Sequence, residues 1–188
     1  MARVRYGIKN LYYAIATDDG NGNLTYATPV HVAGAKSIDL SPAGDSLDEY
    51  ADNVRWYHEE TNQGYDGTLE FEDTAAARVF TQTVLGRTVD TNGLTWENVA
   101  DVVREFAVMV EFSLTGGNAN ETGIRFCFLR CVIGRPNLNG ATSEASKNIQ
   151  TNTVNITSMP RISDGAVQTY CESTDTGYAN FFSAVPTA

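Results

Sequence analysis

Alternation of apolar and polar residues with period two is the feature that most constrains the fold of this chain. Residues 69–72 show it in its simplest form, with Leu69 and Phe71 on one face of a strand and Glu70 and Glu72 on the other. Similar segments occupy residues 6–16, 35–40, 101–114, 124–133, 149–160 and 166–171. Such alternation is typical of half-buried β-strands. The sequence therefore predicts a mainly β protein, an antiparallel β-sandwich or barrel of about seven to nine strands.

One segment has helical spacing instead. Ala76, Val79 and Phe80 lie three and four residues apart, and the apolar pattern continues at Thr83 and Val84. Asp73 or Thr74 can cap the start of a helix, and Gly86 can end one. We expect one α-helix at about residues 74–85, packed over an open edge or end of the sheet.

Residues 41–64 form an unusual acidic stretch. Between Asp39 and Asp73 the chain has 11 acidic residues, and its only Lys or Arg there is Arg55. Four residues of a type usually buried lie among these acids: Leu47, Tyr50, Trp56 and Tyr57. Because such side chains are costly to expose, we expect a long loop or hairpin that packs on another copy of the chain. Packing back onto its own domain is the alternative.

The overall charge bears on possible partners. The 188 residues include 13 Lys and Arg against 23 Asp and Glu, for a net charge of −10. A protein that grips nucleic acid through its phosphates needs a cationic face, so this class is disfavoured. No apolar run reaches the roughly 18–20 residues of a membrane span. The N-terminal residues lack the apolar core of a signal peptide, so we expect a soluble protein made inside the cell, with no membrane partner.

The sequence offers no catalytic or metal-binding constellation. His58 precedes Glu59 and Glu60, but adjacent residues on a strand point to opposite faces, and no nucleophile motif accompanies them. Glu70 and Glu72 have a spacing used by two-carboxylate hydrolases, although a solvent-exposed sheet face gives the same pattern far more often. Cys127 and Cys131 should share one strand face roughly 13 Å apart, too far for a disulfide. We therefore expect no enzyme, no cofactor and no metal.

Several ordered motifs resemble one family, the major tail proteins (tail tube proteins) of siphophages, especially the group from Gram-positive hosts. The most specific are Tyr50-Ala51-Asp52-Asn53 and Asn62-Gln63-Gly64-Tyr65-Asp66-Gly67. The other matching segments are residues 6–14, 26–30, 34–38, 134–136, 140–161 and 164–165. The likeness covers most of residues 6–170, and the helix and the residues after Cys171 depart from the family pattern.

This resemblance implies a structural virion protein. Its subunits would form hexameric rings that stack into a hollow tube, through which phage DNA passes during ejection without specific binding. Residues 1–172 would be the tail-tube domain, with residues 41–64 as its ring-to-ring element, and residues 173–188 a C-terminal extension of uncertain role. The implied partners are further copies, the tape measure protein, the tail terminator and the distal tail protein. The implied location is the phage tail, assembled in the host cytoplasm.

The candidate site residues follow from both arguments. The residues expected at contacts between subunits are Leu47, Tyr50, Trp56, Tyr57 and Tyr65. Glu70 and Glu72 are expected to line the lumen, because an anionic lining repels phosphate and lets DNA slide. A second class of function is also possible: a β-sandwich carbohydrate-binding module, monomeric or oligomeric, that uses Trp56, Tyr57 and Tyr65 as a stacking platform.

Overall fold

The computed structural model describes residues 3–115, 123–138, 140, 142 and 149–187. Residues 141 and 143–148 of the matching segment 140–161 lie outside these residues. The elements of the described chain are β1 (Val4–Asp18), β2 (Leu24–Tyr26), β3 (Val30–Val32), β4 (Ala35–Ala43), β5 (Ser46–Ala51), β6 (Val54–Glu60), β7 (Gly64–Glu72), α1 (Ala75–Val84), β8 (Thr88–Val89), β9 (Thr95–Trp96), β10 (Phe106–Thr115), β11 (Gly123–Ile133), β12 (Thr151–Ser158) and β13 (Gln168–Glu172).

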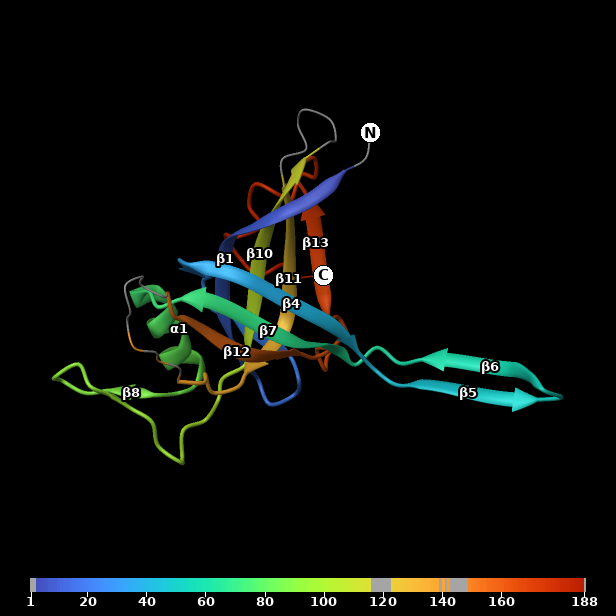
Figure 1. The fold of residues 1–188 in the computed structure, drawn as a ribbon, viewed down its shortest axis with the longest axis horizontal. Helices are drawn as coiled ribbons and strands as arrows, with labels where there is room; N and C mark the ends of the chain where they lie inside the picture. Colours follow the sequence, from blue (N-terminus) through green and yellow to red (C-terminus); the bar gives the residue numbers. More distant parts are fainter. Residues whose placement is uncertain (1–2, 116–122, 139, 141, 143–148, 188) are drawn as a thin grey trace.

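Nine of these strands form one antiparallel sheet. Its order is β2-β1-β10-β11-β12-β7-β4, with β3 paired to β1 and β13 paired to β11. The last strand, β4, lies close to β1, so the sheet curls back over itself and encloses a core (Figure 1). The prediction of a mainly β, antiparallel fold with a helix near residues 74–85 is confirmed.

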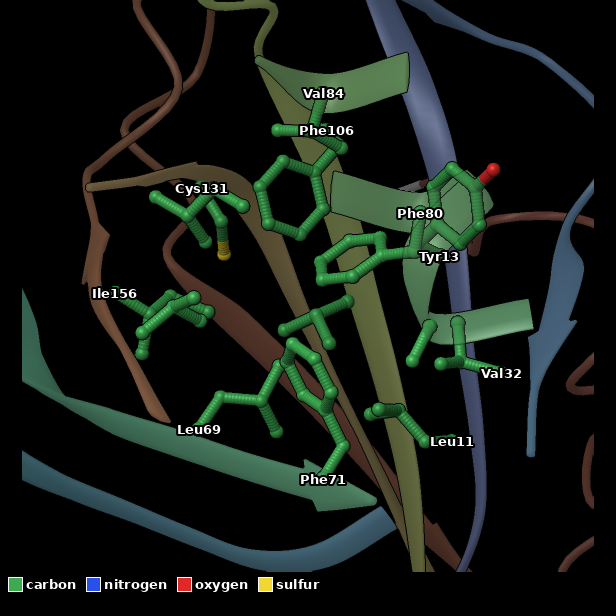
Figure 2. Close-up of a cluster of buried hydrophobic side chains, with 14 of the residues drawn as sticks. Leu11, Tyr13, Val32, Leu69, Phe71, Phe80, Val84, Phe106, Cys131 and Ile156 are labelled. Carbon is green, nitrogen blue, oxygen red and sulfur yellow. The ribbon is translucent and has the colours of Figure 1, made fainter. Parts of the chain in front are cut away.

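Helix α1 closes one end of the main core. The Thr74 hydroxyl accepts a hydrogen bond from the Ala77 amide at 3.1 Å, as an N-cap does. Phe80 projects from the helix into a group of rings contributed by the sheet, with centroid distances of 4.9 Å to Tyr13, 5.5 Å to Phe106 and 6.0 Å to Phe71 (Figure 2). All four rings are nearly fully buried, so the helix is held to the sheet through Phe80.

The other face of β1, β10 and β11 carries a second, smaller core. Here Met109 and Cys127 from the sheet pack with Phe181 and Val185 from the C-terminal segment. Phe181 and Val185 are both buried. The chain after β13 therefore packs against the body over this face.

A register shift in the β10–β11 pair decides which of the two cores each cysteine of β11 joins. Phe106 pairs with Cys131 but Val108 pairs with Phe128, so β11 has one extra residue in this stretch. Such a bulge reverses the alternation of side chains. As a result Cys127 packs in the smaller core and Cys131 in the main core. The prediction that both thiols share one face is wrong, because the bulge lies between them.

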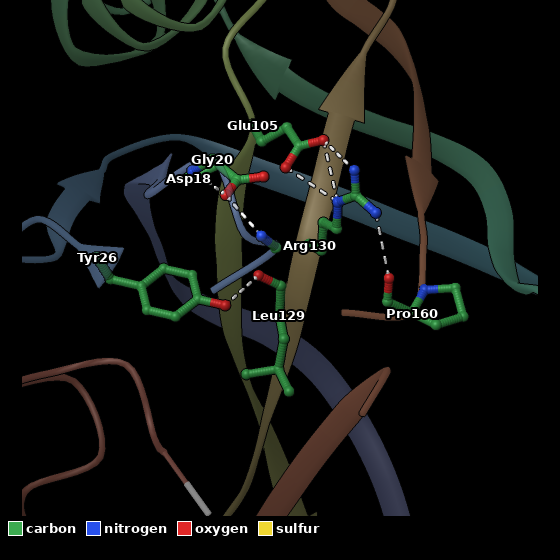
Figure 3. A network of polar contacts seen from close by, with 8 residues as sticks. Asp18, Gly20, Tyr26, Glu105, Leu129, Arg130 and Pro160 are labelled. Atoms are coloured by element: carbon green, nitrogen blue, oxygen red, sulfur yellow. Dashed lines mark hydrogen bonds and ion pairs between the residues drawn. The ribbon is translucent and has the colours of Figure 1, made fainter. Parts of the chain in front are cut away.

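Arg130 lies in the bulged stretch and belongs to neither core. Its guanidinium binds the Glu105 carboxylate through two nitrogens, with Nη2 at 2.6 Å from Oε1 and Nε at 2.9 Å from Oε2, and donates to the Pro160 carbonyl at 3.4 Å (Figure 3). Nearby, the Tyr26 hydroxyl donates to the Leu129 carbonyl at 2.9 Å. These polar contacts tie the bulged stretch of β11 to Glu105, Pro160 and Tyr26.

The strand predicted at residues 101–114 begins later than expected. β10 begins at Phe106, and residues 101–105 are not part of any strand. The Glu105 carbonyl accepts from the Ala16 amide at 2.8 Å, while the Arg104 amide donates to the Val84 carbonyl at the end of the helix. The apolar residues Val102 and Val103 therefore lie exposed before the strand rather than inside it.

Glu111 is a buried carboxylate that joins the sheet to the C-terminal segment. It accepts from Asn10 Nδ2 at 3.1 Å, Arg125 Nε at 2.9 Å and the Tyr178 hydroxyl at 3.1 Å, and Lys9 Nζ lies 3.2 Å away. Burial alone would raise the pKa of Glu111, but the hydrogen bonds from Asn10 and Arg125 and the guanidinium charge outweigh it, so the net shift is downward. The Arg125 guanidinium also lies 3.7 Å from the centroid of the Tyr178 ring.

This arrangement predicts acid-sensitive stability. The folded pKa of Glu111 lies below its unfolded value near 4.5, so its contribution is complete above that pH and is lost as the pH falls through the folded pKa. Glu111→Gln should lower the free energy of unfolding at pH 7 by about 2–3 kcal/mol and flatten its dependence on pH below about 4.5. Urea unfolding at several pH values measures both effects. An acid limb as steep in the variant as in the parent would contradict this role.

Candidate assembly surfaces

The strands β5 and β6 form a hairpin that projects from the body, called here the arm (Ser46–Glu60) (Figure 1). It continues the β4–β7 pair, because the Gln63 amide donates to the Ala43 carbonyl at 2.9 Å and the Thr61 amide to the Asp45 carbonyl at 3.0 Å. At its tip Asp52 and Asn53 have φ angles of 50° and 60°. Two consecutive left-handed residues make the tight turn that suits the twist of a hairpin.

Both faces of the arm are open to solvent. Every residue of β5 and of β6 is exposed, and within the described chain these two strands pair only with each other. The exposed fraction reaches 75% for Trp56 and 68% for Tyr50. An isolated two-stranded hairpin is at best marginally stable in water. Because β5 and β6 pair only with each other in the described chain, the arm presents unpaired edges. It also exposes large apolar side chains, which are Leu47, Tyr50, Val54, Trp56 and Tyr57.

The pairing register divides the arm into two mixed faces. Tyr57 pairs with Glu49, and its hydroxyl donates to Glu59 at 2.7 Å, which raises the pKa of Tyr57. On the opposite face His58 pairs with Asp48, with 2.6 Å between Nδ1 and Oδ1. Each face thus carries both apolar side chains and carboxylates. The sequence analysis missed the Asp48–His58 contact, which the hairpin register could have suggested.

Tyr65 lies apart from the other four contact candidates. It is in β7, half-buried against the main core, with its ring 5.4 Å from the Phe128 centroid and its hydroxyl accepting from Gln168 Nε2 at 3.0 Å. The preceding Gly64 has a φ of +106°, and a Cβ there would lie 1.9 Å from the Ser158 carbonyl oxygen. Only glycine fits this close approach of β7 to β12, which fixes where the arm leaves the sheet.

The outward side of β12, β7 and β4 forms a second surface, called here the polar face. Thr153, Glu70 and Ser37 face outward in register, and so do Asn155, Thr68 and Asp39. Leu69, between them, points into the core. The acidic residues of the polar face are Asp39, Asp66, Glu70 and Glu72. The first two were not among the predicted lining residues, and the cross-strand register identifies them.

Glu70 is held in place on the polar face. It accepts from the Thr151 hydroxyl at 2.6 Å, from Lys36 Nζ at 3.0 Å and from the Ser37 hydroxyl at 3.2 Å. The hydrogen bond from Thr151 and then that from Lys36 lower the pKa of Glu70, so it is ionised at neutral pH. Lys36 is the cation bound to this carboxylate, while Asp39, Asp66 and Glu72 add further negative charge. The polar face is therefore net anionic.

A third surface is a cleft that has β4 on one side and residues of β1, β10 and β11 on the other. Its volume is about 240 Å³, and its walls include Ile38, Leu40, Phe112 and Phe126. The Arg5 guanidinium lies over two of these rings, 4.9 Å from the Phe112 centroid and 5.6 Å from that of Phe126. The cleft is thus apolar with a cation at its rim.

The remaining candidates for a reactive or metal-binding role, the thiols of Cys127 and Cys131, are structural. Cys131 is fully buried, which raises its pKa to about 12, and burial also raises the pKa of Cys127. Neither thiol has the low pKa of a reactive cysteine. In the described residues no three His, Cys, Asp or Glu side chains gather in a way that could hold a metal ion. No helix among those residues has the length and apolar character needed to span a membrane.

Comparison with known proteins gives only distant likenesses. No protein-family model matches the chain, and no curated protein sequence does. Among solved structures, the anti-feeding prophage (AFP) baseplate matches with a TM-score of 0.47 and 10% identity, over 93% of this chain and 100% of that one. The AFP tube terminating cap matches with a TM-score of 0.44 and 12% identity, over 90% and 93%. The PVC sheath/tube terminator of an extracellular contractile injection system matches with a TM-score of 0.43 and 10% identity, over 86% and 92%.

Proposed function

We propose that this chain is the major tail tube subunit of a siphophage, forming hexameric rings that stack into a hollow tube for DNA. The observation that carries the proposal is the arm, a hairpin exposed on both faces that nonetheless bears five large apolar side chains. Exposed apolar surface of this kind marks a site of association. The specific identity comes from the sequence motifs, two of which fall on the arm tip and on the start of β7.

The arm suits contact with identical subunits. It is anchored by backbone hydrogen bonds that continue the β4–β7 ladder, so it projects in a defined direction from the body (Figure 1). A directed projection that binds a different surface on the next copy makes a head-to-tail contact, and such contacts generate rings or open filaments. Stacked rings need contacts of this kind between successive layers.

The polar face suits the lumen of such a tube. It spans three neighbouring strands, and its side chains are short hydroxyls and amides interspersed with four carboxylates. Duplex DNA carries a dense negative charge, so a net anionic lining repels it and gives it no phosphate contacts to bind. Glu70 and Glu72 are the lining residues in this proposal, joined by Asp39 and Asp66.

The proposed location and partners follow from the same assignment. The tube would belong to the virion tail and would assemble in the host cytoplasm. It would contact the tape measure protein inside, the tail terminator at one end and the distal tail protein at the other. Residues 1–172 would be the tube-forming domain, and residues 173–188 an extension that packs on the smaller core through Phe181 and Val185.

The alternative of a carbohydrate platform lacks a supporting arrangement. Trp56 and Tyr57 lie on the arm, whereas Tyr65 packs against Phe128 on the body. Tyr65 follows Tyr57 by eight positions, a separation that can span up to roughly 26 Å in extended chain. These rings do not form one stacking surface.

The proposal is tested by sedimentation of the purified chain over a range of concentrations. A tube subunit should pass from monomer to large particles above a threshold concentration. A chain that sediments as a monomer at every concentration would contradict the proposal.

The anionic lining leads to a charge-reversal prediction. Glu72→Lys should give tubes that retain duplex DNA at about 50 mM salt and release it at about 500 mM, because each added phosphate contact steepens the salt dependence. Glu72→Gln, which removes charge without adding a cation, should retain little DNA and serves as the matched control. Co-sedimentation of DNA with tubes measures retention. Equal retention of DNA by the parent and the Glu72→Lys variant would contradict the placement of Glu72 in the lumen.

A further inference from the structure

The cleft beside Arg5 combines an exposed cation with apolar walls, which suits it to bind part of a protein partner. Arg5 is exposed, and among the described residues no carboxylate contacts its guanidinium, which instead lies over Phe112 and Phe126. The walls below it are aliphatic and aromatic. At about 240 Å³ the cleft is smaller than the roughly 300 Å³ at the low end of small-molecule pockets, so it suits one or two side chains of a protein partner.

One side of the cleft is an open sheet edge. β4 contributes Ile38 and Leu40 to the cleft, and β7 is the one strand of the described chain with which it pairs. Its other edge therefore keeps free backbone donors and acceptors, which can accept an added strand. The occupant best suited to this edge is an extended segment that presents apolar side chains to the walls and a carboxylate to Arg5.

The arm of a second copy meets these requirements. It is extended, its outer edges are unpaired, and it carries five acidic residues against Arg55 over residues 46–60. Apolar side chains and carboxylates occur together on each face, as the walls and rim of the cleft require. We propose that the cleft receives the arm of a neighbouring copy, with an arm carboxylate paired to Arg5 and Trp56 as the main apolar anchor.

A second hollow, near β8 and β9, fits the arm less well. It is lined by Arg87, Glu97, Asp101 and Arg135 among others. Both arginines there are already paired with Glu97, and the two carboxylates would repel an acidic arm. Charge therefore favours the cleft at Arg5.

The proposal deepens the function proposed above and rests on it, so the test must separate the two. Arg5→Glu should raise the threshold concentration for assembly at least tenfold, because a charge-assisted contact is replaced by repulsion. The thermal midpoint of the unassembled subunit should stay the same. Arg104→Glu is the matched control, since Arg104 is also exposed and its guanidinium makes no hydrogen bond or ion pair within the described chain, but it does not line the cleft.

Mixing two defective variants tests the contact directly. Arg5→Glu keeps an intact arm, and Trp56→Ala keeps an intact cleft, so an equal mixture can form one arm–cleft contact per pair. Sedimentation velocity should show heterodimers in the mixture at concentrations where each variant alone is monomeric.

The outcomes distinguish the two proposals. If the parent assembles and Arg5→Glu assembles equally well, the cleft is not the receiving site, while the tube function stands. The same holds if both variants fail to assemble and their mixture stays monomeric. If the parent itself never assembles, the proposed function fails and this inference fails with it.

Discussion

Trp56→Ala should prevent tube formation at concentrations where the parent assembles, while leaving the free subunit as stable as before. The side chain is 75% exposed in the subunit and belongs to neither hydrophobic core of the described residues, so its removal costs the isolated fold little. At an interface, a central buried tryptophan contributes about 2–4 kcal/mol. A loss of that size raises the threshold concentration by roughly 30-fold to 1,000-fold.

The second tryptophan offers a matched control. Trp96 is in β9, is 54% exposed and donates from Nε1 to Asp90 at 3.2 Å, so it belongs to a different projection of the chain. Trp96→Ala should leave the assembly threshold nearly unchanged. Light scattering during a concentration series measures the threshold, and circular dichroism on heating measures the thermal midpoint. A Trp56→Ala subunit that melts far below the parent yet still assembles would show that the arm packs on its own chain.

Phe80→Ala should lower the free energy of unfolding by about 3–5 kcal/mol, the range for removing a buried aromatic ring. Phe80 is 1% exposed, and its ring contacts those of Tyr13, Phe71 and Phe106 (Figure 2). Its loss leaves a cavity where the helix meets the sheet, and neighbours fixed in two different elements cannot easily collapse into it. The thermal midpoint should fall by roughly 6–20 °C for a chain of this size.

Val79→Ala provides the control for this experiment. Val79 precedes Phe80 on the same helix but is 51% exposed, so its truncation should cost less than about 1 kcal/mol. Urea unfolding should be measured in the Trp56→Ala background, because assembly stabilises the folded state and would mask the difference. Equal losses for the two variants would contradict the role of Phe80 in holding the helix to the sheet.

The parts of the fold that depend on local pattern could be predicted from the sequence. Period-two alternation identified the longer strands of the main sheet, and the spacing of Val79, Phe80 and Val84 identified the helix to within a residue at each end. The sequence also predicted a long loop or hairpin at residues 41–64, and a hairpin with its tip at Asp52 and Asn53 lies there. In each case the residues that determine the structure are close in sequence, so their local pattern is enough to predict it.

The features that depend on pairing between distant residues could not be predicted. The bulge between Phe128 and Cys131 is marked by neither glycine nor proline, and it became visible only through the register with β10. The late start of β10 depends on contacts of residues 104 and 105 with β1 and the helix end. Alternation alone predicted neither.

The candidate site divides in the same way. The exposed apolar residues of the arm could be identified from their acidic surroundings in the sequence. The cleft could not, because Arg5, Leu40 and Phe126 come from three strands far apart in the chain. Asp39 and Asp66 joined Glu70 on the polar face only when the strand order placed β4, β7 and β12 side by side.

Cryo-electron microscopy of the purified chain at high concentration tests the central claim most directly. We expect hollow tubes built from stacked six-membered rings, with the arm of each subunit in contact with a neighbour and the outward side of β12, β7 and β4 facing an open bore. Particles without a central channel, or a bore lined by cationic side chains, would contradict it.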